Sequence, residues 1–327
     1  MKTKAFIYIL FSAAILIGCS TPNTPDAIVQ IQDCAPIPSP RACAAACSLN
    51  GEGYIFGGRT QDKKPTKDIW RYTPSTDSWT RITSFPGKAR LNAVIIAYEN
   101  ALYMGLGFSG ERVYVDSCYL RDWWRYTPDD GKWTALAQAP TTNTIRGVPY
   151  ICKDRIYLYY STGWSHTNEI ACYDISRNTW EVVPSRSWRS APLFAAAGAQ
   201  CQGRYFFGTG LNWKNSNRWY EINPEDDSWK ALASLPGKGR ELCAYTANDT
   251  YIYLFGGRFF AGEYTGGEVF GDYLRYDAEN NRWDWCGAMP CGKGENMIAF
   301  TIDNTIYFGL GEDEKGNLYN SLYSIEK

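Results

Sequence analysis

Residues 70–79 read WRYTPSTDSW, and residues 124–133 repeat this stretch as WRYTPDDGKW. The same pattern returns as ACYDISRNTW at 171–180 and as LRYDAENNRW at 274–283. In each stretch a Tyr precedes a Trp by seven residues, and Pro, Asp, Asn or Gly residues that favour tight turns lie between them. Two strands joined by a short turn give this pattern, so the sequence predicts a repeated β-hairpin unit.

The tryptophan that ends the pattern sets the length of the repeat. It recurs with spacings of 54, 47, 49 and 54 residues, at Trp79, Trp133, Trp180, Trp229 and Trp283. A glycine pair or a Gly-x-Gly group precedes the Tyr in most repeats, as at Gly57-Gly58 and Gly256-Gly257. A repeat of about 50 residues with these marks resembles the kelch repeat, whose unit is a four-stranded blade of a β-propeller. The resemblance implies an all-β fold.

The number of blades follows from the two ends of the chain. The fifth repeat predicts strands at 242–247, 251–255, 273–277 and 282–285. The sixth repeat begins at Glu295 and stops after residues 322–325 without a fourth strand. Residues 31–38 align with 79–86 when their prolines are matched, so we expect residues near 28–34 to supply that strand. The expected domain is a six-bladed kelch propeller over 28–327, its last blade closed three-plus-one by an N-terminal strand.

The N-terminus resembles a bacterial lipoprotein signal. Lys2 and Lys4 precede an uncharged stretch from 5 to 18 that is too short to span a membrane comfortably, and Cys19 follows. The resemblance implies a signal peptide at 1–18 and a tether at 19–27 that is lipidated on Cys19. Ser20 in place of Asp favours the outer membrane, facing the periplasm or the cell surface. An ordinary secretory signal with a coincidental Cys is the alternative.

Composition narrows the classes of partner. The formal charge is −1, and without Lys2 and Lys4 the chain has 31 basic and 34 acidic residues. This balance does not favour a nucleic-acid partner. Ten cysteines accompany Cys19, and we favour buried thiols over disulfides for most of them. With one His and no C-x-x-C spacing, we expect neither a metal nor another cofactor. The expected state is a monomer that contacts the membrane only through its lipid.

Arginines are the first candidate ligand-binding residues. In kelch proteins the connections between the fourth strand of one blade and the first strand of the next surround one mouth of the central channel, together with the loops between second and third strands. By repeat position, such connections carry Arg41, Arg90, Arg146, Arg189 and Arg240, and Glu295 replaces the Arg in the last one. Arg59 and Arg258 follow the glycine pairs. Converging guanidinium groups would bind a carboxylate or sulfate, although such arginines also bond to the backbone within their own blade.

Aromatic and proton-carrying residues complete the candidate site. Trp213 and Phe259 lie in loops between second and third strands, where they would stack on a sugar ring or pack on a neighbouring blade. The catalytic candidates are Glu241, Glu295 and His166, the single His of the chain. The copper oxidases that resemble galactose oxidase share this kind of propeller but need two His, so this chain is not expected to be one of them.

Three functions are compatible with these residues. The first is a lipid-anchored binding module of the bacterial envelope, for an anionic or carbohydrate ligand or a protein. The second is an N-acetylneuraminate (sialic acid) mutarotase, because exported bacterial kelch propellers include such enzymes. These need an Arg for the sugar carboxylate and an acid/base pair to open and close the ring. The third is an envelope scaffold that binds no small ligand.

Overall fold

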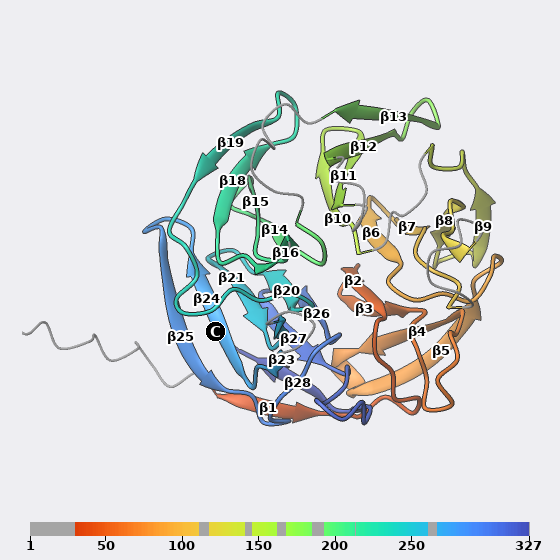
Figure 1. Ribbon diagram of the computed structural model, residues 1–327. Coiled ribbons are helices and arrows are strands. Elements are labelled where there is room, and N and C mark those ends of the chain that lie inside the picture. Colours follow the sequence, from red (N-terminus) through yellow and green to blue (C-terminus); the bar gives the residue numbers. More distant parts are fainter. Residues whose placement is uncertain are drawn as a thin grey trace, which may run out of the picture.

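The computed structural model describes residues 30–110, 118–140, 146–161, 168–184, 193–212, 214–260 and 267–326. Within these ranges the chain forms six four-stranded antiparallel sheets that surround a central axis (Figure 1). The described elements are strands apart from one 3-10 turn, η1 (Pro74–Thr76). The fold is therefore the six-bladed all-β propeller that the repeat predicts. Among these residues there is no helix with the length and apolar character that crossing a membrane requires.

The blades are numbered in chain order, and their strands are given from the channel outward. Blade 1 contains β2 (Ala45–Leu49), β3 (Glu52–Phe56), β4 (Asp68–Thr73) and β5 (Ser78–Ser84), and blade 2 contains β6 (Val94–Tyr98), β7 (Ala101–Gly105), β8 (Trp123–Thr127) and β9 (Lys132–Ala135). Blade 3 contains β10 (Val148–Cys152), β11 (Arg155–Ser161), β12 (Asn168–Asp174) and β13 (Thr179–Pro184), and blade 4 contains β14 (Ala197–Cys201), β15 (Arg204–Gly208), β18 (Trp219–Asn223) and β19 (Ser228–Ala231). Blade 5 contains β20 (Ala244–Ala247), β21 (Tyr251–Phe255), β24 (Asp272–Asp277) and β25 (Arg282–Ala288), and blade 6 contains β26 (Ile298–Ile302), β27 (Thr305–Gly309), β28 (Leu322–Ile325) and β1 (Ile31–Cys34).

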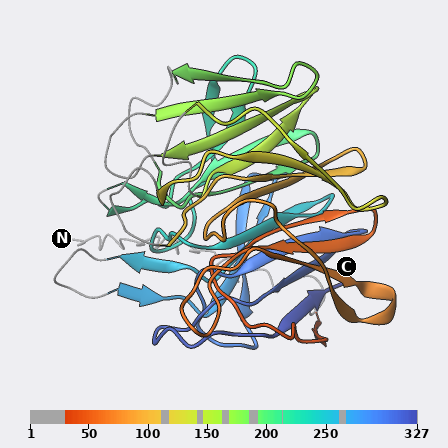
Figure 2. The ribbon, with the colours of Figure 1, turned by 90° about the vertical axis from the view of Figure 1, so that its right-hand side faces the viewer.

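Two short ribbons leave the blades. One joins β16 (Leu211–Asn212) to β17 (Lys214–Asn215) in blade 4, and the other joins β22 (Arg258–Phe260) to β23 (Gly267–Val269) in blade 5. The β22–β23 ribbon stands out from one face of the propeller (Figure 2). Both ribbons follow the second strand of their blade, so they belong to the loops around one mouth of the channel.

The last blade is closed by the N-terminal strand, as the aligned prolines predict. β1 lies beside β28 in Figure 1, and the two strands pair antiparallel from Ile31 opposite Ile325 to Cys34 opposite Leu322. Ile37 takes the buried position that Phe85 holds in blade 1. This pairing leaves blade 6 without an open sheet edge on its outer side.

The predicted strands of the fifth repeat are confirmed, with different bounds in three of them. β21 has the predicted bounds, β24 begins one residue earlier than expected, and β25 ends at Ala288, three residues later than expected. The innermost strand, β20, begins at Ala244 and not at Leu242, because Leu242 has a φ of 59°. That left-handed backbone conformation is incompatible with a strand.

Aromatic layers fill the space between blades. The Tyr72 ring packs on Trp79 of its own blade at 5.0 Å between centroids and on Tyr307 of blade 6 at 5.4 Å. Equivalent contacts join Tyr173 to Trp180 and Tyr276 to Trp283. The repeated Tyr and Trp thus bury large apolar surfaces where one sheet meets the next.

The same residues fasten neighbouring blades by hydrogen bonds. In blade 5, Asn281 Oδ1 accepts a bond from the Tyr276 hydroxyl and another from the Ala233 amide of blade 4, both at 2.8 Å. Trp283 Nε1 donates to the carbonyl oxygen of the same Ala233 at 2.9 Å. We call this set of three bonds the clasp. It satisfies both backbone groups of one residue from the adjacent blade.

Among the described residues the clasp occurs at every second interface. It recurs between blades 6 and 1 and between blades 2 and 3, with Asp77, Trp79 and Ala35, and with Asn178, Trp180 and Ala137. Blade 2 has Gly131 at the acceptor position, and its Trp133 Nε1 is buried without a hydrogen-bond partner. In blade 4, Trp229 Nε1 bonds to Asp227 of its own blade.

This difference between tryptophans gives a direct test of the clasp. Trp283→Phe should destabilise the protein by about 1 kcal/mol more than Trp133→Phe, because only the first substitution removes a hydrogen bond and leaves a partly buried carbonyl without its partner. Urea unfolding of the two variants measures the difference, and both lose a similar amount of apolar surface. Equal losses of stability would show that packing alone joins the blades.

Candidate functional site

The innermost strands of the blades line a central channel. At one end it holds a cavity of about 240 Å³, lined mainly by Ala, Val, Ile and Met side chains, which we call the channel cavity. A cavity of about 650 Å³ with a more polar lining lies toward the opposite end, and we call it the far cavity. The two share Tyr245 and Ala46 among their lining residues, so they adjoin each other at this level.

A ring of backbone hydrogen bonds surrounds the entrance to the channel cavity. The residue two positions before each innermost strand has a φ between 52° and 59°, and we call these six residues the entrance ring: Cys43, Asn92, Arg146, Ala195, Leu242 and Asn296. Amide-to-carbonyl bonds link five of the six neighbouring pairs, namely Cys43 to Asn296, Asn92 to Cys43, Arg146 to Asn92, Leu242 to Ala195 and Asn296 to Leu242, at 2.9–3.3 Å. The ring therefore fixes where each of these side chains starts.

The entrance ring corrects the sequence alignment of the arginines. Arg41, Arg90 and Arg240 each lie two residues before a ring member, whereas Arg146 is itself a ring member. Glu295 precedes ring residue Asn296 as Glu241 precedes Leu242, so Glu295 corresponds to Glu241 and does not replace an Arg. The alignment was wrong by one or two positions here because it matched residue types where only the backbone conformation identifies the repeat.

Arg41, Arg90 and Arg240 are already paired with carboxylates of their own blades. Arg41 is fully buried, and its Nη1 and Nη2 donate to the two oxygens of Asp68 at 2.7 and 3.1 Å. Burial alone would raise the pKa of Asp68, but the bonds from Arg41 hold it below its usual value. Arg90 pairs in the same way with Asp122, and Arg240 with Asp272.

Each of these arginines also bonds to a backbone carbonyl near the glycine pair of its blade, for example Gly57 and Gly256. Each of these arginines therefore joins the segment before the innermost strand of its blade to the start of the third strand. These contacts engage the three guanidinium groups within their own blades, and the ligand-binding role that the sequence predicts for them stays a prediction.

The other predicted residues meet around the mouth. In the five blades where the structure describes it, the residue before the ring member forms a backbone bridge with the residue after the glycine pair, as in Glu241 with Arg258 and Glu295 with Glu312. Ion pairs then cross between blades: Arg258 of blade 5 lies 3.4 Å from Glu295 of blade 6, and Arg59 of blade 1 pairs with Glu312 of blade 6. Blades 5, 6 and 1 thus contribute a charged arc.

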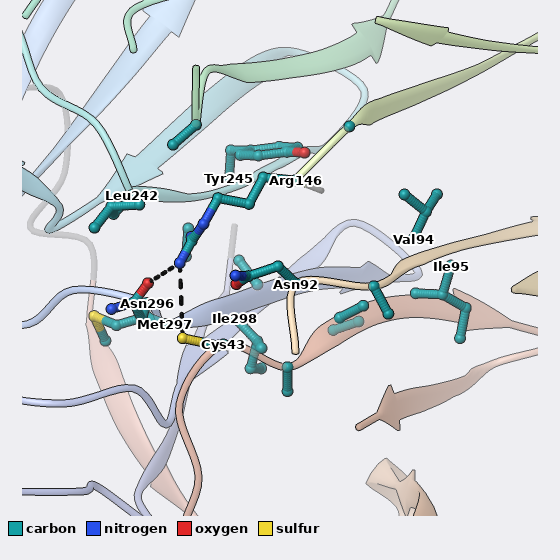
Figure 3. Close-up of a pocket in the computed structure, with 18 of the residues that line it drawn as sticks. Cys43, Asn92, Val94, Ile95, Arg146, Leu242, Tyr245, Asn296, Met297 and Ile298 are labelled. Atoms are coloured by element: carbon teal, nitrogen blue, oxygen red, sulfur yellow. Dashed lines mark hydrogen bonds between the residues drawn. The ribbon is translucent and has the colours of Figure 1, made fainter. Parts of the chain in front are cut away.

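Arg146 reaches across the channel to this arc. Its Nη2 donates to Asn296 Oδ1 of blade 6 at 2.6 Å and lies 3.7 Å from Cys43 Sγ of blade 1 (Figure 3). Because blades 3 and 6 stand opposite each other in the ring of six, the side chain spans the entrance to the channel cavity. Asn296 in turn donates to Glu312 at 2.8 Å. Arg146 forms no ion pair with any residue in the described ranges.

Two carboxyl groups of the arc are held in an environment that favours their neutral forms. Glu241 is 5% exposed, and burial raises its pKa to about 7, with a further rise from Glu295 and opposing effects of Arg146 and Arg258. Burial also raises the pKa of Glu295. Glu241 is therefore divided between its neutral and ionised forms near pH 7, which suits a proton donor or acceptor.

Apolar residues take the equivalent positions on other blades. Leu91 bridges Phe108 in blade 2, and Phe194 bridges Leu211 in blade 4, where blade 5 has Glu241 and Arg258. All four side chains are half-buried. The mouth is thus charged along blades 5, 6 and 1 and apolar along the described parts of blades 2 and 4.

The remaining predicted residues lie away from this arrangement or outside the described ranges. Phe259 is on the β22–β23 ribbon, where Lys238 Nζ lies 5.2 Å from its ring centroid. Trp213, His166, Arg189 and Cys19 fall outside the residues that the structure describes. In the described part of the chain, no three His, Cys, Asp or Glu side chains group closely enough to hold a metal ion. The ten described cysteines are free thiols.

Sequence reasoning missed Glu312, Asn296 and Cys43. Glu312 follows Gly309-Leu310-Gly311 as Arg258 follows Gly256-Gly257, so the rule that selected Arg258 would have found it. No sequence pattern identifies Asn296 and Cys43, because their roles depend on the position of the Arg146 guanidinium in the folded protein.

The raised pKa of Glu241 predicts a pH-dependent stability. A folded-state pKa near 7 above the usual 4.5 means that the folded form binds more protons between these values, so the protein loses stability as pH rises from about 4.5 to 7. For a pKa shift of this size, the free energy of unfolding changes by up to about 3 kcal/mol. Glu241→Gln should remove this pH dependence. The unfolding free energy of the variant, measured with urea and compared with that of the wild type, should therefore increase from pH 5 to pH 7.5. A constant difference would contradict the raised pKa.

Comparison with known proteins places this arrangement in a family. A KLHDC2/KLHL20/DRC7 Kelch-repeats domain matches residues 24–208, and a Kelch motif matches residues 239–290. A solved structure of YjhT superposes with a TM-score of 0.74 at 16% identity, covering 88% of this chain and 95% of that one. At this identity the likeness concerns the fold.

The curated relatives that match this chain are longer proteins, and the match covers only part of each. Kelch-like protein 35 of Mus musculus is 25% identical over 236 residues, which are 70% of this chain and 38% of that protein. Kelch-like protein 25 of Xenopus tropicalis is 24% identical over 265 residues, 78% of this chain and 42% of the relative. N-acetylneuraminate epimerase of Haemophilus influenzae is 23% identical over 248 residues, 75% of this chain and 60% of the relative. The chain spans less than two thirds of each, and by its repeats, its blades and these matches it belongs to the kelch-repeat family.

Proposed function

We propose that the mouth binds a small ligand through a carboxylate that pairs with Arg146. The supporting observation is that Arg146 reaches across the channel to the neutral acceptors Asn296 and Cys43 and has no carboxylate partner among the described residues. A guanidinium offers parallel N–H groups that match a carboxylate, and a charged pair is stronger than the present neutral contacts.

The charged arc favours a ligand with hydroxyl groups next to the carboxylate. Glu295 Oε2 and Arg258 Nε are buried without a hydrogen-bond partner, so one unmet acceptor and one unmet donor lie beside the mouth. Buried polar atoms of this kind are costly unless a ligand or water completes them. A sugar hydroxyl can donate to Glu295 while a neighbouring one accepts from Arg258, so an acidic sugar fits the arc.

The proposed setting is the bacterial envelope. It rests on the N-terminal sequence pattern, in which Cys19 would carry the lipid and hold the propeller at the outer membrane as a monomer. In this setting the propeller is a binding module that presents its mouth to an anionic sugar or to a protein that displays one.

The binding proposal predicts a specific loss. Arg146→Gln should weaken binding of N-acetylneuraminate at least tenfold, because it removes a charged hydrogen-bond donor. Arg177→Gln is the control, since this Arg lies exposed at the turn between β12 and β13. Saturation-transfer NMR titration of the mature domain measures both, with the methyl ester of the sugar as a ligand that lacks the charge. Equal binding of acid and ester would contradict the proposal.

A second candidate function is mutarotation of such a sugar. Two observations favour it: Glu241 has a pKa of about 7 beside Glu295, and one curated relative is named N-acetylneuraminate epimerase. A neutral carboxyl would give a proton to the ring oxygen while an ionised one takes the proton of the anomeric hydroxyl. The ring then opens to the ketone and closes on the other face, and the reverse transfers restore both groups.

Anomer exchange tests this candidate separately from binding. Exchange followed by NMR should exceed the buffer rate and should fall at least a hundredfold in Glu241→Gln, in line with the usual contribution of an acid/base group. Glu279→Gln, on the exposed turn between β24 and β25, is the matched control. Binding without exchange above the buffer rate would exclude mutarotation of this sugar and leave the binding module.

A further inference from the structure

The channel cavity lies directly behind the proposed carboxylate site. We infer that it receives an apolar substituent of the ligand, so the preferred ligand is an amphipathic carboxylate that carries a short alkyl, acyl or aryl group. This inference rests on the proposed function and adds the chemical class of the ligand to it.

The lining of the channel cavity supports this inference. Ala44, Ala93 and Ala244 lie at its edge, and Val94, Ile298 and Met297 are among its larger lining residues. Small side chains on the innermost strands leave space that larger ones would fill. An aliphatic cavity of about 150 Å³ is known to stay dry and to bind benzene. At about 240 Å³ the channel cavity has room for a group of at least this size.

The position of Arg146 connects this space to the anionic group. Its guanidinium lies at the entrance ring, and it lines the cavity together with the apolar residues. A carboxylate paired with Arg146 therefore places the adjoining substituent at the cavity opening. The lining is more polar at the far cavity, where Thr246, Thr301 and Gln200 are among the lining residues, and this bounds the apolar group.

The aliphatic part of this lining disfavours hydroxyl groups. A hydroxyl placed against the side chains of Val94, Ile298 or Met297 loses its bonds to water without replacement, whereas Arg146, Asn92 and Asn296 offer partners to the polar part of a ligand. The polar part of a ligand is thereby kept to the charged arc, and the apolar part is directed into the channel. A sugar acid would enter with an acyl substituent and not with its hydroxylated face.

A series of straight-chain carboxylates tests the inference on the intact mature domain. Acetate, butyrate and hexanoate are titrated by NMR chemical-shift perturbation, with hexanol as the uncharged control. Affinity should rise roughly fourfold for each added methylene that enters the cavity. Hexanol should bind at least tenfold more weakly than hexanoate. Equal affinity along the series, with N-acetylneuraminate still bound, would overturn the inference and leave the proposed function intact. Failure of every carboxylate to bind would overturn both.

A cavity-filling variant locates the effect. Ala45 lines the channel cavity but not the far cavity, and Ala247 lines the far cavity but not the channel cavity. Both residues are half-buried on innermost strands. Ala45→Leu should weaken the binding of hexanoate at least tenfold and change the affinity for acetate less than twofold. Ala247→Leu should leave the affinities of the whole series unchanged. Thermal unfolding checks that each variant folds. Equal weakening by both variants would overturn the inference, and if Ala45→Leu does not fold, the chain-length series on the wild type decides.

Discussion

The backbone ring at the channel entrance is the constraint on which the candidate site depends. Each of its members adopts a left-handed φ, and amide-to-carbonyl bonds join five of the six neighbouring pairs around the channel. A non-glycine residue accepts this conformation at some cost, which the surrounding bonds offset. The entrance ring therefore fixes the backbone positions of six residues around the channel, but it does not determine which side chains they carry.

That freedom is what makes a symmetric fold produce an asymmetric mouth. The framework arginines that precede the ring, such as Arg41 and Arg240, are paired with the carboxylates of Asp68 and Asp272 and hold each loop in place. Arg146 stands two residues further along, inside the ring, and so projects over the channel. The same residue type serves the fold in one position and the mouth in the other, because a shift of two residues moves the guanidinium from a blade to the axis.

Much of the fold was predictable because the repeat records it directly. The Tyr and Trp mark the strand pairs, and the matched prolines locate β1 beside β28 before any contact is known. The site was less accessible. Arg59, Arg258, Glu241 and Glu295 were predicted from their repeat positions, but their partners were not, since ion pairs such as Arg59 with Glu312 join residues of different repeats. The raised pKa of Glu241 arises from burial, which a residue pattern does not report.

The alternating clasps divide the propeller into three pairs of blades: 6 with 1, 2 with 3, and 4 with 5. A circularly permuted chain would therefore not tolerate all new openings equally. New ends placed between blades 1 and 2 or between blades 5 and 6 separate no clasped partners, so the backbone groups of Ala35, Ala137 and Ala233 stay covered. Ends placed between blades 4 and 5 would let the Ala233 amide and carbonyl drift from Asn281 and Trp283. In this sense the propeller is a ring of three double blades, with three natural seams.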